Sequence, residues 1–295
     1  MASISIETKK FADLEEILEV SEDGLILVHD GNGVKTMTVQ NFKADLKALI
    51  DANADLLAKL SSKNAGAHNS IYRGKYLGSS VTAAQYAAIS AGTFDDLYIG
   101  DYWTIGGVNY RIAAFDYYLN CGDTACNTHH VVIVPDTCLY NHVMNDTNVT
   151  TGGYTGSKMY TEGLANAKTT IKGAFGAAHI LSHRSYLTNA VTNGYPSAGA
   201  WFDSEIELMN ENNVYGGKMF TGVTCGTNVP ALYTIDKGQF PLFALEPSRI
   251  TNRATYWLRD VVSASNFARV NDDGLATNYA ASASLGVRPA FSIKS

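Results

Sequence analysis

The hydrophobic pattern at the start of the chain predicts a helix followed by a hairpin. Apolar residues recur at helical spacing over residues 11–18. Two apolar runs, at 25–28 and 34–39, are then separated by a segment that ends in Asn32-Gly33, a dipeptide typical of tight hairpin turns. We therefore expect a small N-terminal module over residues 1–40.

Residues 41–69 begin with apolar positions spaced alternately by four and three residues, which is the a/d pattern of a coiled-coil seam. These positions are Phe42, Leu46, Leu49, Leu56 and Leu60. Asn53 occupies the remaining seam position; it could fix a coiled-coil register or mark a weaker apolar stripe on a single packed helix. The small and polar residues at 61–67 resemble a flexible linker and offer the helix little to pack against. We therefore expect a short coiled coil followed by a linker.

After residue 70 the pattern changes to dense aromatic residues, strands and turns, which predicts a mixed α+β domain. The strands are expected at 97–112, folded about Gly106-Gly107, and at 130–135, 240–245, 254–259 and 287–293. Helices are expected from Gly163 to His183 and from Trp201 to Asn210.

The composition argues against nucleic acid and membranes as partners. The chain has 295 residues, of which 46% are hydrophobic, and a net charge of −6 without basic runs. It can build a sizeable core, but it lacks the clustered Lys and Arg that nucleic-acid binding requires. We find neither an apolar run long enough to cross a membrane nor a signal peptide. We therefore expect no membrane insertion, and we expect the chain to be made and folded in a cytosol.

The residue types of the chain are typical of a surface that binds other molecules. Charged residues make up only 17% of the chain, whereas it has 26 glycines and 17 tyrosines. Tyr provides contact area at a low cost in side-chain entropy, and small polar residues adapt around it, as on antibody paratopes. The composition therefore favours recognition through Tyr, Asn, Ser and Thr.

Two groups of residues could bind a metal. One is a cluster of thiols and imidazoles formed by Cys121, Cys126, His129 and His130, with Cys138 nearby. Its spacing does not match that of common zinc sites, because a second distant pair is missing, so we expect reduced thiols, or a Cys121–Cys126 disulfide after release into an oxidising medium. The other is His179 with His183, four apart on the predicted helix, for which a hydrogen-bonded pair is the simpler interpretation. We expect no metal and no cofactor.

No local catalytic signature is present. The chain lacks the Gly-x-Ser-x-Gly elbow, the phosphate-binding Gly-x-x-x-x-Gly-Lys-Ser/Thr loop and the His-Glu-x-x-His helix. Four acidic residues are close together and could form a carboxylate pair or a calcium site, but we expect them on the outer face of the predicted helix at 201–210. They are Asp203, Glu205, Glu207 and Glu211. We therefore expect no catalytic residues.

Two motifs near the C-terminus carry a resemblance to a known family. They are Tyr256-Trp257-Leu258-Arg259-Asp260 and Gly286-Val287-Arg288-Pro289-Ala290-Phe291. Both resemble the C-terminal part of C-type-lectin-like variable proteins that retroelements diversify, among them phage receptor-binding proteins. The resemblance implies a C-type lectin-like ligand-binding domain over residues 70–295, with a variable region at about 256–291.

In that family the stretch between the two motifs is exposed and contacts the ligand. Its variable positions arise from mutated adenines in Asn codons, which cannot yield Lys, Glu, Gln, Met or Trp, and residues 260–286 contain none of these. Any loop of small residues could show the same absence. We expect two anchored strands to hold this loop, so that stability and recognition depend on different residues. The implied ligand-binding residues, among which Arg269 and Tyr279 should contribute most, are Asp260, Val262, Ala264, Asn266, Arg269, Asn271, Asp272, Asp273, Thr277, Asn278 and Tyr279.

The resemblance implies a phage or prophage display protein that binds a host-surface protein or glycan. It further implies a homotrimer that is a tail or capsid appendage of the virion, assembled in the bacterial cytoplasm and joined to other virion proteins by the N-terminal module. The ligand signatures of calcium-dependent lectins are absent. Two alternatives stay open. One is an enzyme of the related formylglycine-generating type, which needs two reactive cysteines in the C-terminal half, where only Cys225 follows residue 138. The other is a structural fibre or decoration protein.

Overall fold

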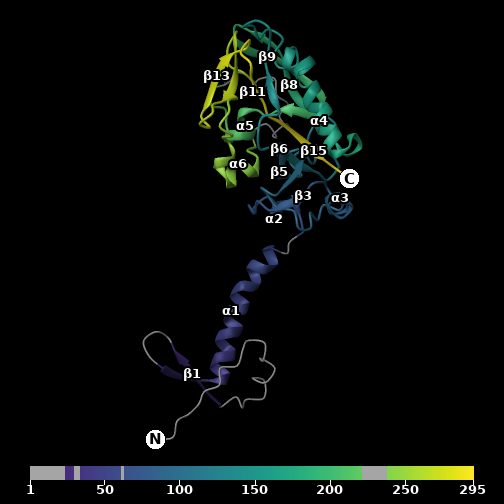
Figure 1. Cartoon of the computed structure of the whole chain (residues 1–295). Helices are drawn as coiled ribbons and strands as arrows, with labels where there is room; N and C mark the ends of the chain where they lie inside the picture. Colours follow the sequence, from purple (N-terminus) through teal and green to yellow (C-terminus); the bar gives the residue numbers. More distant parts are fainter. Residues whose placement is uncertain (1–23, 30–33, 61–62, 221–237) are drawn as a thin grey trace. The chain divides into compact units, whose positions relative to one another are not determined.

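The computed structural model describes residues 24–29, 34–60, 63–220 and 238–295 (Figure 1). These residues fall into two compact units, Met1–Ser62 and Lys63–Ser295, which we describe separately. The helix expected at 11–18, the hairpin turn at 30–33 and Cys225 lie outside the described residues.

The first unit contains the expected hairpin and helix. Strands β1 (Leu25–His29) and β2 (Val34–Thr38) pair antiparallel, and helix α1 (Val39–Leu60) follows at once. The Thr38 hydroxyl accepts the backbone N–H of Asn41 (3.1 Å), which satisfies a donor in the first turn of α1. The predicted helix is therefore confirmed.

One side of α1 carries exposed apolar residues. Three of the expected seam residues, and Ile50 beside them, have between 38% and 60% of their surface exposed. The three are Phe42, Leu46 and Leu49. Although Asn53, Leu56 and Leu60 belong to the same helix, their side chains lie outside the described part of the structure.

Residues 63–69, expected as a linker, belong to the second unit. The Asn64 side chain caps the short helix α2 (Ala65–His68) by accepting the backbone N–H of Ala67 (3.0 Å). His68 is buried and its ring contacts the ring of Phe115. The boundary was misplaced because small and polar residues compose both flexible linkers and capped helical turns.

The second unit contains a six-stranded sheet with the strand order β10-β15-β6-β5-β4-β3. Its strands are β3 (Tyr76–Gly78), β4 (Tyr102–Ile105), β5 (Val108–Phe115), β6 (Val131–Pro135), β10 (Ile206–Leu208) and β15 (Pro289–Ile293). Neighbouring strands are antiparallel except β3 and β4. Gly106 and Gly107 turn between β4 and β5 with φ of 59° and 80°, values that suit a tight hairpin and glycine. The sequence predicted this hairpin correctly.

A five-stranded sheet with the order β13-β12-β11-β14-β7 completes the strand core, together with a separate hairpin of β8 and β9. The strands are β7 (Tyr140–His142), β8 (His183–Thr192), β9 (Tyr195–Ser204), β11 (Tyr256–Val261), β12 (Asn266–Val270), β13 (Ala276–Ala280) and β14 (Leu285–Val287). The last two strands of the chain, β14 and β15, lie in different sheets and are separated by Arg288 alone. The chain therefore crosses from one sheet to the other at this residue.

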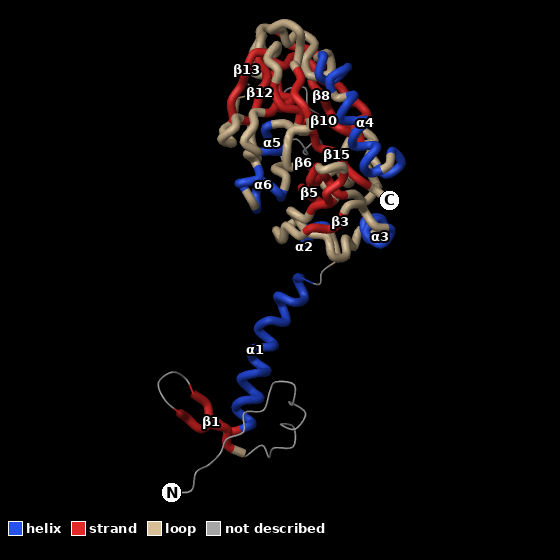
Figure 2. The backbone as a smooth tube through the Cα atoms, viewed as in Figure 1, coloured by secondary structure: helices blue, strands red, loops and turns tan. Residues whose placement is uncertain are grey.

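Short helices flank these strands. They are α3 (Ala83–Ser90), α4 (Ala165–Phe175), α5 (Glu211–Tyr215) and α6 (Pro241–Leu245), with single turns at Met159–Gly163, Ala177–His179 and Pro247–Arg249. Figure 2 shows α4 beside the strands, where Phe175 meets Phe291 of β15 edge-on at 5.1 Å between ring centroids. The aromatic residues of the sequence thus join helix to sheet in a continuous core.

Two expected helices differ from the structure. The helix expected at Trp201–Asn210 is wrong, because these residues form the end of β9, all of β10 and the start of the α5 cap. The helix expected at Gly163–His183 ends at Phe175, since Gly176 has a φ of 84° that a helix cannot contain. His179 and His183 consequently do not share a helix face.

The strand expected at 240–245 is also wrong. Pro241 begins helix α6, with Phe240 as its N-cap residue. Pro at the first helical position is a recognised helix-start signal, because its fixed φ suits a helix and its missing N–H is not needed there. The apolar run concealed this signal.

Candidate functional site

The two motifs with family resemblance form a buried frame. β11 pairs in parallel with β14 through Tyr256 and Gly286, and the Trp257 indole N–H donates to the His142 carbonyl oxygen (2.9 Å). A Cβ atom at Gly286 would collide with Cys138 Sγ and with the Thr255 carbonyl oxygen. Only glycine therefore fits this point of the frame.

Arg288 holds the frame together from the point where the chain changes sheets. Its side chain is 1% exposed, and it donates hydrogen bonds to three carbonyl oxygens and to the Tyr256 hydroxyl (3.2 Å). The three carbonyls belong to Pro135 (2.9 Å), Arg249 (3.0 Å) and Ile250 (3.0 Å). Arg288 thus has a structural role, because its planar guanidinium donates to several acceptors that a single point charge could not reach together.

The residues between the two motifs form a hairpin. β12 and β13 pair antiparallel from Asn266↔Ala280 to Val270↔Ala276, and β12 also pairs with β11. The expectation of a single loop is wrong, because Phe267, Ala268 and Val270 are completely buried and hold β12 in the core. Small residues on both sides conceal this strand in the sequence.

The hairpin divides the expected ligand-binding residues between two faces, because side chains alternate along a strand. Four of them share one face: Arg269, Asn271, Thr277 and Tyr279. Asn266 and Asn278 share the other face, where the Asn266 amide donates to Asn278 Oδ1 (2.7 Å). The first four residues therefore form the coherent part of the expected site.

Arg269 and Tyr279 form the centre of this face. The Arg269 guanidinium carbon lies 4.5 Å from the centre of the Tyr279 ring, within the range of a cation–π interaction, and Tyr279 is 48% exposed. Arg269 Nε is buried without a hydrogen-bond partner. In the described residues no carboxylate forms an ion pair with Arg269. The guanidinium is thus fixed in orientation while its charge is not neutralised by the protein.

Three more of the expected residues lie at the ends of the hairpin. Asp272 and Asp273 are exposed in its turn. The hydrogen bond from the Leu275 backbone N–H lowers the pKa of Asp273, and a hydrogen bond from the Asn271 side chain lowers it by a smaller amount. At the opposite end, Ala264 accepts the backbone N–H of Thr150 (3.1 Å).

The last two expected residues have internal contacts. The Val262 backbone N–H donates to the Asn266 carbonyl oxygen (3.0 Å). Asp260 accepts the backbone N–H of Glu211 (2.7 Å) at the start of α5, where a carboxylate is favourable. The structure therefore does not gather the whole expected set into one surface.

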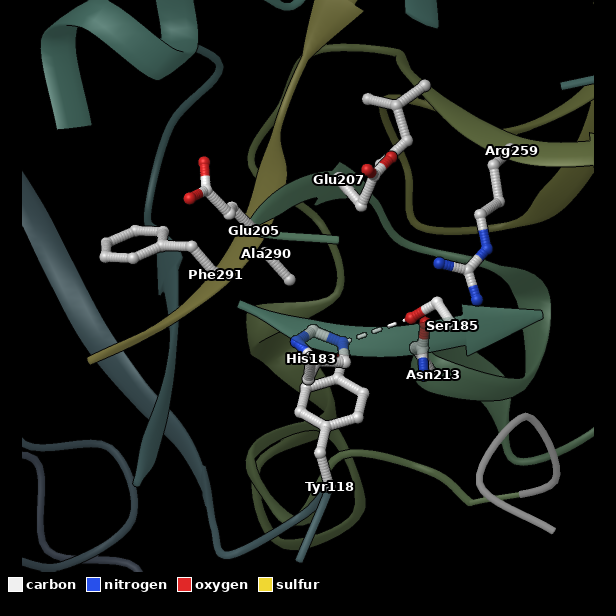
Figure 3. A pocket seen from close by; sticks show the side chains of 10 residues that line it. Tyr118, His183, Ser185, Glu205, Glu207, Asn213, Arg259, Ala290 and Phe291 are labelled. Atoms are coloured by element: carbon white, nitrogen blue, oxygen red, sulfur yellow. Dashed lines mark hydrogen bonds between the residues drawn. The ribbon is translucent and has the colours of Figure 1, made fainter. Parts of the chain in front are cut away.

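A polar hollow inside the same unit was not found from the sequence (Figure 3). It is lined by Tyr118, His183, Ser185, Glu205, Glu207, Leu208, Asn213, Arg259, Ala290 and Phe291. Its residues come from β8, β10, α5, β11 and β15 and from loops. No local spacing could have predicted their meeting.

His183 and Ser185 have the contact of a base and a nucleophile. Ser185 Oγ lies 3.1 Å from His183 Nε2, and the His183 ring stacks on Tyr118 at 3.7 Å between centroids (Figure 3). Burial, with the charges of His130 and Arg259, lowers the pKa of His183 to about 3. The imidazole is therefore neutral at physiological pH and a weak base.

The two acids of the hollow, Glu205 and Glu207, both have partners in the protein: Glu205 forms an ion pair with Lys172 (2.6 Å), and Glu207 is buried. The Glu207 carboxylate accepts the Tyr154 hydroxyl (2.7 Å), and burial raises the pKa of Glu207 although this hydrogen bond lowers it. The expectation that Glu207 lies on an outer helix face is wrong. The hollow has room for about one water molecule and Ser185 is 2% exposed, so a substrate carbonyl would not reach the hydroxyl in this conformation.

The cysteines and histidines of the expected metal cluster make separate local contacts. His129 Nδ1 contacts Asp116 (2.7 Å), and His130 Nε2 accepts the Tyr118 backbone N–H (3.0 Å). Cys121 and Cys126 are free thiols. Among the described residues, no three His, Cys, Asp or Glu side chains are grouped so that they could hold a metal ion.

None of the described helices combines the length and the hydropathy that a membrane crossing requires.

Comparison with known proteins gives one family match. Residues 196–295 match a family model described as a domain of unknown function, DUF6273. Neither the curated proteins nor the solved structures include a match to the chain. The matched segment contains the frame, the hairpin and most of the polar hollow, and the description of the family assigns them no activity.

Proposed function

We propose that the chain is a receptor-binding or display protein of a phage or prophage. In this proposal, Lys63–Ser295 is a C-type lectin-like domain that meets a host-surface ligand through the face of β12 and β13. The observation that carries the proposal is the Arg269–Tyr279 stack, an exposed aromatic residue with an unneutralised cation on a hairpin that is fixed to a buried frame. Tyr and Arg are the residues that most often dominate the energy of protein interfaces.

The separation between frame and hairpin supports this proposal. Trp257, Val287 and Phe291 are buried in the frame, whereas every residue of β13 is at least partly exposed. Substitutions on β13 therefore change the surface while the core is unchanged. A protein that must accept many ligands on one scaffold needs this division.

The first unit suits multivalent display. α1 exposes Phe42, Leu46, Leu49 and Ile50, and the family resemblance supplies the homotrimer in which these residues would be covered. Three copies that face the same cell convert weak single contacts into strong attachment. In the proposal the hairpin of β1 and β2 belongs to the module that joins other virion proteins.

Cell binding by purified protein tests the proposal. Fluorescently labelled chain is added to cells of the bacteria in which the gene or its phage occurs, and bound label is measured. The double variant Arg269→Ala with Tyr279→Ala should lose binding with an unchanged melting temperature. The matched control removes an exposed Arg and an exposed Tyr from other places, Arg253→Ala with Tyr195→Ala, and should bind as the wild type does.

Binding that survives the Arg269 and Tyr279 substitutions would rule out this face. The DNA beside the gene gives an independent test of diversification. A near-copy of the codons for residues 256–291 that differs mainly at adenines, followed by a reverse transcriptase gene, is the expected arrangement. Its absence would remove the diversification part of the proposal.

A further inference from the structure

β13 is an outer strand of the five-stranded sheet. The strand order begins β13-β12-β11, so β13 pairs with β12 on one side and with no other strand among the described residues (Figure 1). An outer strand presents backbone N–H and C=O groups that can pair with another chain. This edge lies immediately beside the Arg269–Tyr279 stack.

The hydrogen bonds at the two ends of the hairpin identify the groups on the edge. The Asn271 N–H donates to the Leu275 carbonyl oxygen (2.9 Å), and the Ala281 N–H donates to that of Ser265 (2.9 Å). Hydrogen-bonded pairs alternate with non-bonded pairs along an antiparallel ladder. The pairs that involve Tyr279 and Thr277 are therefore hydrogen-bonded to β12.

By the same alternation, the backbone groups of Ala276, Asn278 and Ala280 point away from β12. The Ala280 carbonyl oxygen accepts the Ala283 N–H (3.0 Å), whereas the backbone groups of Ala276 and Asn278 have no partner outside the strand in the described residues. Both residues are partly exposed. Two successive donor and acceptor pairs are therefore available at strand spacing.

Arg269, beside this edge, carries a positive charge that no carboxylate of the described residues neutralises. Three other arginines of the unit form ion pairs with aspartates, whereas Arg269 has no carboxylate partner among the described residues. They are Arg73 with Asp101, Arg111 with Asp136, and Arg184 with Asp123. A ligand carboxylate could supply the missing acceptor, because the guanidinium binds carboxylates through two parallel hydrogen bonds.

We propose that β13 binds an extended acidic peptide segment of a partner protein as an added strand, with a carboxylate of that segment on Arg269. This inference rests on the proposed function, because it names the kind of partner that the same face takes. Main-chain hydrogen bonds to Ala276 and Asn278 hold the segment, and Arg269 selects its charge.

The geometry favours a peptide over a glycan. The free backbone groups alternate at strand spacing, which another strand matches along its whole length. A sugar ring would stack on an exposed aromatic face, but Arg269 covers one face of Tyr279. Asp272 and Asp273 at the turn repel a second acid there, so the selected carboxylate lies opposite the middle of β13.

A display library of short random peptides, selected on the immobilised full chain, tests the proposal. We expect the selected peptides to be enriched in Asp and Glu and to compete with one another. A synthetic copy of a selected peptide is then labelled, and its dissociation constant is measured by fluorescence polarisation. Arg269→Gln should weaken binding about tenfold or more, because it replaces a charge-assisted pair with a neutral contact.

The variants at Asn278 separate strand addition from side-chain contact. Asn278→Pro removes the outward N–H and sets a ring against the incoming strand, while the ladder to β12 needs no donor at this position. Asn278→Ala removes the same side chain and keeps the N–H. We expect Asn278→Pro to weaken binding at least about fivefold more than Asn278→Ala.

Hydrogen exchange on the wild-type chain gives a measurement that needs no variant. Peptide binding should slow exchange of the amides at residues 276 and 278. Equal binding by the two Asn278 variants, with unchanged exchange, would overturn strand addition. Selected peptides without acidic enrichment, or a preference for acidic glycans instead, would overturn the partner class. If the selected peptides still bind the double variant Arg269→Ala with Tyr279→Ala, they do not use this face and strand addition fails. Cell binding of the same double variant judges the proposed function separately: loss of cell binding supports it, and retained cell binding overturns it.

Discussion

Replacing Arg288 should destabilise the second unit more than any change on the ligand face. Arg288→Met keeps a long apolar side chain but removes the guanidinium that donates to the carbonyls of Pro135, Arg249 and Ile250. Each buried acceptor left without a donor costs about 1–3 kcal/mol, and breaking a buried charged network costs about 3–5 kcal/mol. Because Arg288 itself no longer has to be desolvated, we expect a loss of about 3–5 kcal/mol.

A second substitution separates charge from shape. Arg288→Lys keeps the positive charge, but one ammonium group cannot reach carbonyl oxygens that lie on both sides of a planar fork. We expect it to recover less than half of the loss. The Tyr256 ring, whose centre is 5.1 Å from the Arg288 guanidinium carbon, also loses its cation–π partner in the Met variant.

Urea unfolding followed by tryptophan fluorescence measures this loss, because Trp257 is buried in the same frame. Arg253→Met is the matched control: Arg253 is exposed, and its side chain makes no hydrogen bond or ion pair among the described residues. The control should change the free energy of unfolding by less than about 0.5 kcal/mol. A loss below about 1 kcal/mol for Arg288→Met would refute the structural role assigned to this residue.

Three further predictions concern other parts of the chain. Leu49→Glu on α1 should convert a sedimenting trimer into monomers, whereas Ala44→Glu on another side of the helix should not; a monomeric wild type would contradict the trimer. The pKa of His183 is lowered to about 3, so the folded state binds fewer protons than the unfolded state between pH 6.5 and 3, and stability should fall as pH is lowered through this window. The contribution of His183 is at most about 1.4 kcal/mol per pH unit, and a His183→Gln variant with an equal slope would argue against it. Oxidised glutathione should join Cys121 and Cys126 in a disulfide, because a backbone hydrogen bond (3.1 Å) already holds the two residues together. We expect the intact mass to fall by two hydrogens and the free energy of unfolding to rise by about 2 kcal/mol, and an unchanged mass would exclude the disulfide.

Local patterns in the sequence identified much of the fold. The hairpin of β1 and β2, the turn at Gly106-Gly107 and helix α1 were predictable because each depends on residues that are neighbours in the chain. The mixed α and β content followed from the same patterns. These elements are decided by short-range geometry.

Elements that depend on distant partners were not predictable. The strand at Trp201, by contrast, had a local signal that went unrecognised: β9 pairs with β8 across Asn193-Gly194, a dipeptide typical of tight hairpin turns. Glu207 is buried because Tyr154 donates a hydrogen bond to it from another segment. An acidic residue in an apolar surrounding looks like an exposed position when its partner is unknown.

The candidate site was predictable only in part. Arg269 and Tyr279 were identified as residues of the types that dominate interfaces, and the structure brings them into contact. The sequence did not indicate that Asn266 and Asn278 would share the opposite face, because the face of a residue follows from the strand register. Nor did it indicate that Asp260 would bind the start of α5.

The position of β13 at the margin of its sheet makes the hairpin a practical scaffold for protein engineering. A substitution on β13 disturbs one ladder, whereas β12 is paired on both sides and contributes Phe267 and Val270 to the core. A combinatorial library that randomises Leu275, Thr277 and Tyr279 would vary three outward side chains on one face with little loss of folded clones. A library with the same number of random codons in β12 would consist mostly of molecules that do not fold.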